Sequence, residues 1–388
     1  MNLNAITTQT IKASTLYKKS RALSAAEVEA FGQRIEAIRA ETLAKVGPED
    51  AAYIYKIRDF VRYSEITSRG LLMAAGWLPP VWLFATGLLG VSKIVENMEL
   101  GHNVMHGQFD WLNDSSLKGA TYDWDNVCPG DAWRHSHNYM HHTYTNIIGK
   151  DRDVGYGILR IAEVQPWKPS DVFNVPKTLL LALAFEWGVG LHDLETEQVI
   201  AGKKPAAQMW NEARPVMRKI ARQVAKDYIF FPVIAGPNAL PVLAGNFTAN
   251  IIRNLWAFAI IFCGHFTAES EMFEDNLSSE TKAEWYLRQL KGSGNLTGGK
   301  WFHILSGNLS HQIEHHMFPD VPANRYAEMA PKVRALCEEY GQYYNTGSFR
   351  KQFSEVVVRI VAMSFPNEVR QAPRSLMARF KGWVGQFA

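Results

Sequence analysis

Cysteine is scarce in this sequence of 388 residues. Its three cysteines, Cys128, Cys263 and Cys337, lie far apart and form no CxxC pair, which excludes a disulfide scaffold and a cysteine-ligated zinc or iron–sulfur site. An excess of charge of one sign is also lacking, because 41 Lys and Arg residues face 38 Asp and Glu residues. A nucleic-acid-binding protein normally carries a much larger basic excess. We therefore expect no nucleic-acid partner.

The N-terminus also lacks the apolar segment and small-residue cleavage pattern of a secretory signal. Charge is missing from two long tracts further along the chain: residues 70–91 carry none, and residues 228–264 carry only Arg253. Each tract is long enough to cross a bilayer, and each is interrupted by residues that break helices, at 78–80 and 236–238. We expect two transmembrane hairpins, about four helices, rather than kinked single spans or the buried helices of a soluble protein.

The distribution of basic residues predicts the orientation of these hairpins. Residues 1–69 contain eleven Lys and Arg residues, and such segments stay in the cytoplasm. The fold class expected is an all-α integral protein of the inner (cytoplasmic) membrane, whose cytoplasmic helical cap holds the active site. We expect an N-terminal cytoplasmic helical region at 1–62, a membrane domain at 63–320 and a C-terminal cytoplasmic helical region at 321–388.

Three shorter segments are expected to be helical. Residues 24–46 begin at a possible capping box of Ser24 and Glu27 and are followed by Gly47-Pro48. Residues 179–191 contain Glu186 and are too short to span comfortably, so an interfacial helix is expected there. Residues 374–383 are basic and amphipathic and would lie on the lipid surface or fray. Arg253 could lie near an interface and extend its charge to water.

The histidines are the most informative residues. All twelve lie between His102 and His316. Three clusters contain His102 and His106; His135, His137, His141 and His142; and His311, His315 and His316, while His192, His265 and His303 stand alone. Residues four apart share a helix face, so the pairs 102/106, 137/141 and 311/315 can each present two imidazoles to one point. Eight histidines are too many for one tetrahedral zinc ion and suit two ions with five or six ligands each.

Two narrower patterns compete with this interpretation. HQIEH, from His311 to His315, matches the HxxEH motif of inverted zinc peptidases, in which Glu314 would be the base. Glu99 and His102 match the ExxH motif of carboxylate-bridged di-iron bundles, which need a second such pair. Each pattern leaves most of the histidines unexplained.

The three boxes, HxxxH, HxxxHH and QxxHH, resemble the signature of the integral-membrane fatty acid desaturases, a superfamily that includes membrane hydroxylases. The resemblance runs from about Gly70 to Tyr326. TYTNIIGKDRDVGYG and NLSHQIEHHMFPDVPANRY are similar to segments of bacterial acyl-CoA and acyl-lipid desaturases related to front-end enzymes.

The resemblance implies a centre of two iron ions. It makes iron ligands of His102, His106, His137, His141, His142, His315 and His316, with His265 as the candidate for a further ligand. Gln312 takes the place of the first histidine of the usual HxxHH box and His311 precedes it, so either could contact iron. Residues expected behind the ligands or at the substrate headgroup are His135, Asp151, Asp153, Trp133 and Arg134, with Lys150 and Arg152 as further headgroup candidates. His192 and His303 are expected to be structural or interfacial.

The implied reaction uses O2 to place a cis double bond in a long-chain acyl group, with acyl-CoA and a delta-9-type product favoured. A membrane di-iron hydroxylase is the alternative, and a membrane zinc peptidase is a distant one. The chain lacks a cysteine-rich ferredoxin segment, the HPGG motif of cytochrome b5 and a GxGxxG fingerprint. An external electron donor, a ferredoxin- or flavin-type reductase, is therefore implied, together with membrane lipid as surroundings.

Overall fold

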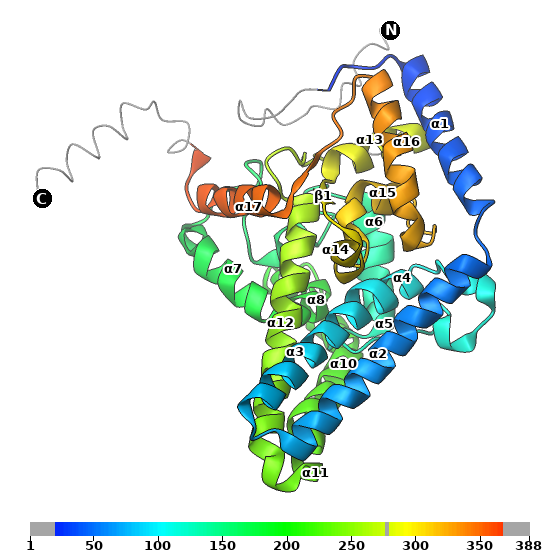
Figure 1. Cartoon of the computed structure of the whole chain (residues 1–388). Coiled ribbons are helices and arrows are strands. Elements are labelled where there is room, and N and C mark those ends of the chain that lie inside the picture. The colour runs from blue at the N-terminus through cyan, green and yellow to red at the C-terminus, as the bar shows by residue number, and fades with distance from the viewer. Residues whose placement is uncertain (1–19, 276–278, 368–388) are drawn as a thin grey trace, which may run out of the picture.

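The computed structural model describes residues 20–275 and 279–367. These residues are mostly helical, as expected (Figure 1). The strands among them, β1 (Asn295–Thr297) and β2 (Thr346–Ser348), form a small parallel pair. The basic amphipathic segment predicted at 374–383 lies outside the described residues.

The first described helix, α1 (Ala25–Leu43), confirms the helix predicted at 24–46. The capping box is present, because the backbone N–H of Glu27 donates to the Ser24 hydroxyl and the backbone N–H of Ser24 donates to the Glu27 carboxylate. Phe31 and Ile35 are buried on one face. This face contacts α13 (Lys282–Gly292) and α16 (Tyr326–Glu339), so the N-terminal helix is fastened to the later part of the chain.

The first uncharged tract forms the tip of a helix hairpin. α2 (Pro48–Ala75) runs toward the tip, and α3 (Pro79–Val95) returns along it. Leu78 is extended and Pro79 opens the second helix, as expected for prolines at a helix start. The predicted hairpin shape is thus present in the fold.

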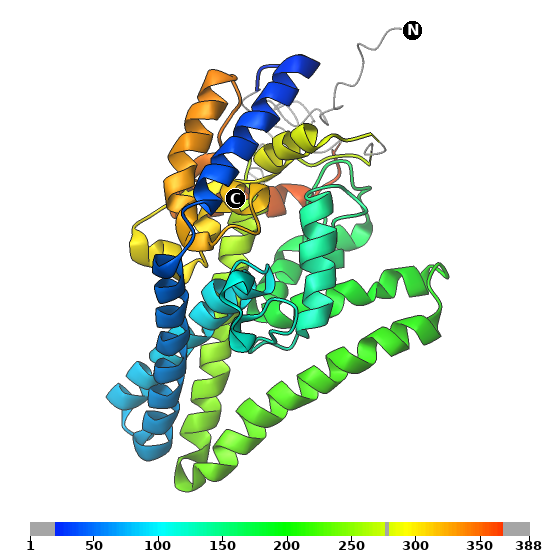
Figure 2. The same ribbon diagram turned by 90° about the vertical axis from the view of Figure 1, so that its right-hand side faces the viewer.

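The second tract forms another hairpin. α10 (Ala206–Val224), a π-helical turn (Ala225–Phe230) and α11 (Phe231–Ile234) lead to its tip, and α12 (Ala239–His265) returns from it. Figure 2 shows this arm meeting α12 at the lower end of the molecule, where α11 lies, and diverging from it above along α10. α12 packs against α3 and α2, so the two hairpins are joined along their length.

By length and composition, one helical stretch of the described residues, Gly236–His265, is suited to crossing a membrane. The segments Pro169–Leu183 and Phe185–Ile200 meet at a bend of 95°. Together they are apolar and long enough to count as a second span that is broken at the bend. The fold therefore does not confirm the expected four membrane helices. One reason is that the break at 76–78 divides the first tract between two helices, and α2 carries many charged residues.

Arg253 does not extend to water, which corrects the sequence expectation. Its side chain is 2% exposed and pairs with Glu186 of α8 (Phe185–Leu191). The segment 179–191 bends at Ala184 between α7 (Asn174–Leu183) and α8. The resulting turn brings the Glu186 carboxylate to α12.

The remaining helices surround the ends of the hairpins. They are α4 (His102–Met105), α5 (Gly130–Trp133), α6 (His142–Tyr144), α9 (Thr196–Ile200), α14 (Lys300–Leu305), α15 (Gln312–Met317) and α17 (Phe349–Met363). α17 packs across α7 and α12. The largest apolar core includes Phe258, Phe262 and Phe266, in and just after the C-terminal part of α12, next to the histidine-bearing segments.

Candidate metal centre

The three histidine boxes meet at one place, although they are far apart in the sequence. His102 and His106 begin and end the turn of α4, which continues the π-helical turn Glu96–Gly101. His137 and His141 lie in a second π-helical turn, Arg134–His141, and His315 lies in α15. π-helical turns are rare and occur often at functional sites.

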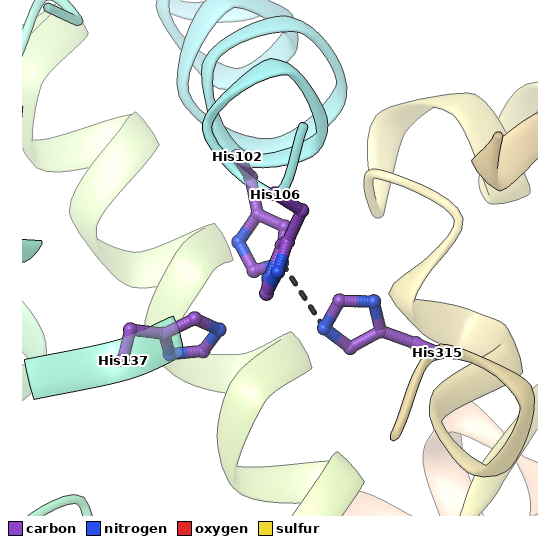
Figure 3. Close-up of side chains that lie close together, drawn as sticks. All are labelled: His102, His106, His137 and His315. Carbon is purple, nitrogen blue, oxygen red and sulfur yellow. Dashed lines mark hydrogen bonds between the residues drawn. The ribbon is translucent and has the colours of Figure 1, made fainter. Parts of the chain in front are cut away.

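The first cluster consists of His102, His106, His137 and His315. One ring nitrogen from each lies within 4.8 Å of those of the others. Figure 3 shows the four rings turned toward one another from three separate segments. Nε2 of His102 lies 3.2 Å from Nε2 of His315. All three boxes therefore contribute to this cluster.

The second cluster consists of His141, His265 and His316. Nε2 of His265 lies 3.3 Å from Nε2 of His141 and 3.0 Å from Nε2 of His316. His142 lies between the clusters, with its ring centre 4.6 Å from that of His106 and 4.4 Å from that of His316. The isolated His265 thus joins the boxes.

The grouping differs from the simple four-residue spacing. Only His102 and His106 share a cluster as an i, i+4 pair, whereas His137 and His141 contribute to different clusters. His315 belongs to the first cluster and His316 to the second, but both also form a further group with His142, which links the two clusters.

The histidines are prepared to bind a metal ion. The buried atoms Nε2 of His106, Nε2 of His137 and both ring nitrogens of His142 have no hydrogen-bond partner, which is costly unless another partner is supplied. Burial lowers the pKa of His102, His106, His142, His315 and His316. The neutral imidazole that this favours is the form that ligates transition metals.

Two carboxylates stand behind the second box. Both oxygens of Asp151 lie 3.0 Å from Nδ1 of His141. Oδ2 of Asp153 lies 3.6 Å from Nδ1 of His137 and 3.7 Å from Nδ1 of His141. Burial lowers the pKa of His141, but the two carboxylates outweigh it and raise that pKa to about 9. They therefore hold the Nδ1 side of this ring, and Nε2 is the nitrogen that faces His265 in the second cluster.

Gln312 and His311 have different surroundings. Nε2 of Gln312 lies 2.9 Å from Nε2 of His265, and Oε1 of Gln312 is buried without a hydrogen-bond partner. The ring of His311 instead stacks on His303, with centres 4.6 Å apart, and belongs to neither cluster. Of the two candidates, Gln312 is the one that reaches the site.

The same geometry contradicts the zinc peptidase interpretation. That mechanism needs His311 and His315 on one ion with Glu314 free as a base, but His311 is not grouped with His315. The Glu314 carboxylate accepts hydrogen bonds from the Asn295 amide and the Tyr344 hydroxyl, and burial raises its pKa to about 7. Glu314 is therefore held by its neighbours.

Three further candidates were expected near the site. Trp133 is there, stacked on His137 with ring centres 4.4 Å apart. The His135 side chain is 52% exposed and faces Asp193, away from both clusters. Arg134 pairs with Asp131 and donates to the carbonyls of Gly119 and Tyr122. His135 thus faces away from both clusters, and the headgroup role expected of Arg134 stays a prediction.

Lys150 and Arg152 are also engaged by protein carboxylates. Lys150 lies 2.8 Å from Asp275. Arg152 pairs with Asp193 and, at 2.9 Å, with Glu195. Both side chains are therefore already committed to ion pairs at the surface.

Glu99 of the ExxH pattern joins neither cluster. It is buried and accepts hydrogen bonds from the Tyr53 hydroxyl at 2.6 Å and the Asn308 amide at 2.9 Å. Burial raises its pKa to about 8. The carboxylate thus connects α2, the first box and the loop before the third box.

A cavity borders both clusters. His102, His137, His141, His265 and Gln312 line it on the metal side. Its apolar lining includes Met98, Phe185, Val189, Ala257, Ile261 and Leu309. An apolar cavity with a few polar groups at one wall is typical of a small-molecule site. The candidate ligands form part of its polar lining, together with Asn97, Asn126 and the Glu186–Arg253 ion pair.

His192, which the sequence analysis expects to be structural or interfacial, lies beside the site. It also lines the cavity, and its Nε2 lies 3.1 Å from Oδ1 of Asp153. Its isolated position far from any box provides no spacing signal. Only the fold brings it to the carboxylate.

Comparison with known proteins agrees with the site. The model of the family "fatty acid desaturase" matches residues 75–348. An NADPH-dependent stearoyl-CoA 9-desaturase of Mycobacterium tuberculosis is 41% identical over 351 residues, which cover 89% of this chain and 82% of the relative. An sn-1 linoleoyl-lipid 6-desaturase of Synechocystis is 26% identical over 278 residues, 68% of this chain and 75% of the relative. The resemblance predicted from the histidine boxes is confirmed: the chain belongs to the fatty acid desaturase family and is an oxidoreductase of lipid metabolism.

Proposed function

We propose that this desaturase acts on a long-chain saturated acyl-CoA and forms a cis double bond of the delta-9 type. The support is the mycobacterial relative, whose name specifies stearoyl-CoA and position 9 and which aligns with 89% of this chain at 41% identity. The acyl-lipid relative is only 26% identical and covers 68% of the chain. An acyl-CoA substrate is therefore favoured over a phospholipid acyl group.

The metal centre of the proposal consists of two iron ions. His102, His106, His137 and His315 would hold one ion, and His141, His265 and His316 the other, with His142 between them and the Gln312 amide beside the second. This assignment rests on the two nitrogen groups and on the buried nitrogens that lack hydrogen-bond partners. Imidazole ligands suit iron. When bound, the ions would supply the activation of O2 that removal of hydrogen from a methylene requires.

The protein's own contribution is positioning. The apolar side chains that line the cavity would hold an alkyl chain next to the histidines and exclude water from it. Asp151 would orient His141 by accepting from its Nδ1, and the Asp153 carboxylate, 3.6 Å from Nδ1 of His137, would act on that ring by its charge. The convergence of eight histidines from distant segments beside this cavity is the single observation that carries the proposal.

The surroundings of the hairpins suggest a membrane protein. Large apolar side chains that are more than half exposed gather at the two tips and include Trp77, Leu83, Phe84, Val233 and Leu240. A group of exposed apolar side chains of this size marks an interaction surface. We place these tips in the inner membrane and the histidines on its cytoplasmic side, in agreement with the basic N-terminal region.

The regions at 1–62 and 321–388 would then be cytoplasmic. A green fluorescent protein fused after residue 388 should fluoresce, because it folds in the cytoplasm. An alkaline phosphatase fused there should be inactive, because it needs the periplasm. The reverse pattern would contradict the proposed orientation.

Electrons would come from a separate protein. The relative's name records NADPH dependence, and this chain lacks a dinucleotide fingerprint. Purified enzyme supplied with NADPH alone should be inactive, and a ferredoxin- or flavin-type reductase should restore turnover. Turnover with NADPH alone would contradict an external donor.

The decisive experiment is expression in a host that lacks this double bond. Gas chromatography with mass spectrometry should show a new monounsaturated fatty acid, and derivatisation should locate the bond at carbon 9. His137→Ala should abolish the product at unchanged protein level, with Ala37→Gln on the exposed side of α1 as the matched control. A hydroxylated product would favour the hydroxylase alternative. Metal analysis that finds one zinc ion would contradict the di-iron centre.

Stearoyl-CoA and stearoyl-phospholipid should then be compared in vitro with the same reductase. Rapid formation of oleoyl-CoA from the first substrate is expected. A preference for the phospholipid would overturn the substrate class while leaving the desaturase chemistry intact.

A further inference from the structure

His192 forms a buried link between α8 and the second histidine box. It follows the last residue of α8, and its side chain is only 3% exposed. Nδ1 lies 2.9 Å from the carbonyl oxygen of Val189, and Nε2 lies 3.1 Å from Oδ1 of Asp153. Nδ1 thus has a hydrogen-bond acceptor, whereas Nε2 approaches the Asp153 carboxylate closely without the alignment of a hydrogen bond.

The Asp153 carboxylate also faces one histidine of each metal cluster. Its other oxygen, Oδ2, lies 3.6 Å from Nδ1 of His137 in the first cluster and 3.7 Å from Nδ1 of His141 in the second. The carboxylate is 11% exposed, and a buried carboxylate needs partners of this kind. Asp151, by contrast, faces only His141 among the cluster histidines.

We infer that His192 is a positioning residue: it fixes the Asp153 carboxylate, which in turn orients one histidine of each metal cluster. This inference rests on the proposed two-iron centre. His192 touches no candidate ligand itself, and its effect would pass through Asp153. Partners behind metal-ligating histidines typically change metal affinity by about 10- to 100-fold when they are removed.

The position of α8 gives this link a structural context. Phe185, Glu186 and Val189 of α8 line the cavity beside the metal site. Glu186 pairs with Arg253 of α12 at one end of α8, and His192 reaches Asp153 just beyond the other. The same short helix therefore lines the cavity and is followed directly by the residue that contacts Asp153. A substitution at His192 would change the position of Asp153 and, through it, of the candidate ligands His137 and His141.

The test compares four single variants of the full-length enzyme in detergent, and the double variant of His192→Phe with Asp153→Asn. His192→Phe removes the contact, Asp153→Asn removes the carboxylate charge, and His192→Gln keeps an amide donor for Asp153. Asp193→Asn is the matched control, because the adjacent Asp193 faces Arg152 and His135 at the surface. The measurements are iron per chain, the rate of iron loss to a chelator and the Mössbauer spectrum, with thermal unfolding as the check on folding.

His192→Phe and Asp153→Asn should each speed the loss of both irons by about 10- to 100-fold. The double variant should be no worse than Asp153→Asn alone, since His192 acts through that carboxylate. His192→Gln and Asp193→Asn should stay near the wild type. Multiplied effects in the double variant, loss of only one iron, or wild-type retention in His192→Phe would each overturn the inference. A wild-type enzyme that holds a single zinc ion would instead refute the proposed function.

Discussion

At the scale of single residues, Gln312 and His311 are neighbours in the chain but face different partners. Gln312 contacts His265 of the second cluster, whereas His311 stacks on His303. We predict that Gln312→Ala lowers iron occupancy, because it removes the amide oxygen that is buried beside this cluster without a partner. His311→Gln should keep both irons. Iron per chain by mass spectrometry separates the two outcomes.

Gln312→His provides the conservative counterpart, because it restores the histidine usual at this position in the family motif. This variant should bind two irons. Equal iron loss in Gln312→Ala and His311→Gln would show that any substitution in the third box lowers iron binding by disturbing the local structure. That result would refute the assignment of Gln312 to the metal site.

The sequence predicted the chemistry of these residues better than their grouping. Clustered histidines indicate a metal centre wherever the boxes meet, and that convergence was confirmed. Their division between two clusters depends on the π-helical turn at Arg134–His141 and on the path of α12, which brings His265 to the boxes. Neither feature has a local sequence pattern, so the partition could not be read from spacing.

At the scale of elements, Asp50 connects the start of α2 to the segment before α16. It accepts two hydrogen bonds of 2.7 Å from Arg325, one from Asn324 and one from the backbone N–H of Gly47. Burial raises the pKa of Asp50, but these donors outweigh it and lower the pKa below its usual value. We predict that Asp50→Asn destabilises the protein by about 2 kcal/mol at neutral pH, measured by thermal unfolding.

The pH dependence has a defined sign. Because the pKa of Asp50 is lower in the folded protein than in the unfolded chain, its stabilisation is complete above about pH 4 and is lost as the pH falls through the folded value. The melting temperature of the wild type should therefore fall more steeply between pH 5 and 3 than that of Asp50→Asn. Glu49→Gln, next to it and 91% exposed, is the control. Parallel curves for all three proteins would contradict the role of Asp50.

Helix starts and breaks could be predicted where a short stretch of sequence determines them. The capping box of α1 and the proline breaks of both hairpins lie in short stretches of sequence, and the helices begin or turn there as expected. The small parallel sheet joins Asn295–Thr297 to Thr346–Ser348, a pairing over a long sequence distance that no local pattern records. The bend at Ala184 similarly accompanies the pairing of Glu186 with Arg253, a residue far away in the sequence.

At the scale of the whole molecule, one buried ionic group joins the two hairpins. Asp227 lies 3.0 Å from both Lys93 of α3 and Arg69 of α2, and these side chains are less than 10% exposed. We predict that Asp227→Asn costs about 3–5 kcal/mol of stability, because it leaves two buried cations short of a counter-charge. Glu41→Gln, which breaks the exposed pairs with Lys45 and Lys332, should change thermal unfolding little. Equal melting temperatures for the two variants would refute this account.

The hairpin tips lie at the lower end of the molecule, below α4 and α15, which carry His102 and His315 of the first cluster (Figure 1). Replacing Leu83 and Phe84 at one tip by glutamine should weaken membrane attachment, because these exposed apolar side chains would no longer partition into lipid. The measurement is the fraction of protein released from membranes by alkaline carbonate. The double substitution Ala37→Gln and Ala40→Gln on the exposed side of α1 is the control. Iron content should stay at the wild-type level, since the tip residues belong to neither histidine cluster. Unchanged release would mean that this tip does not insert, and loss of iron without release would mean that it serves the metal centre instead.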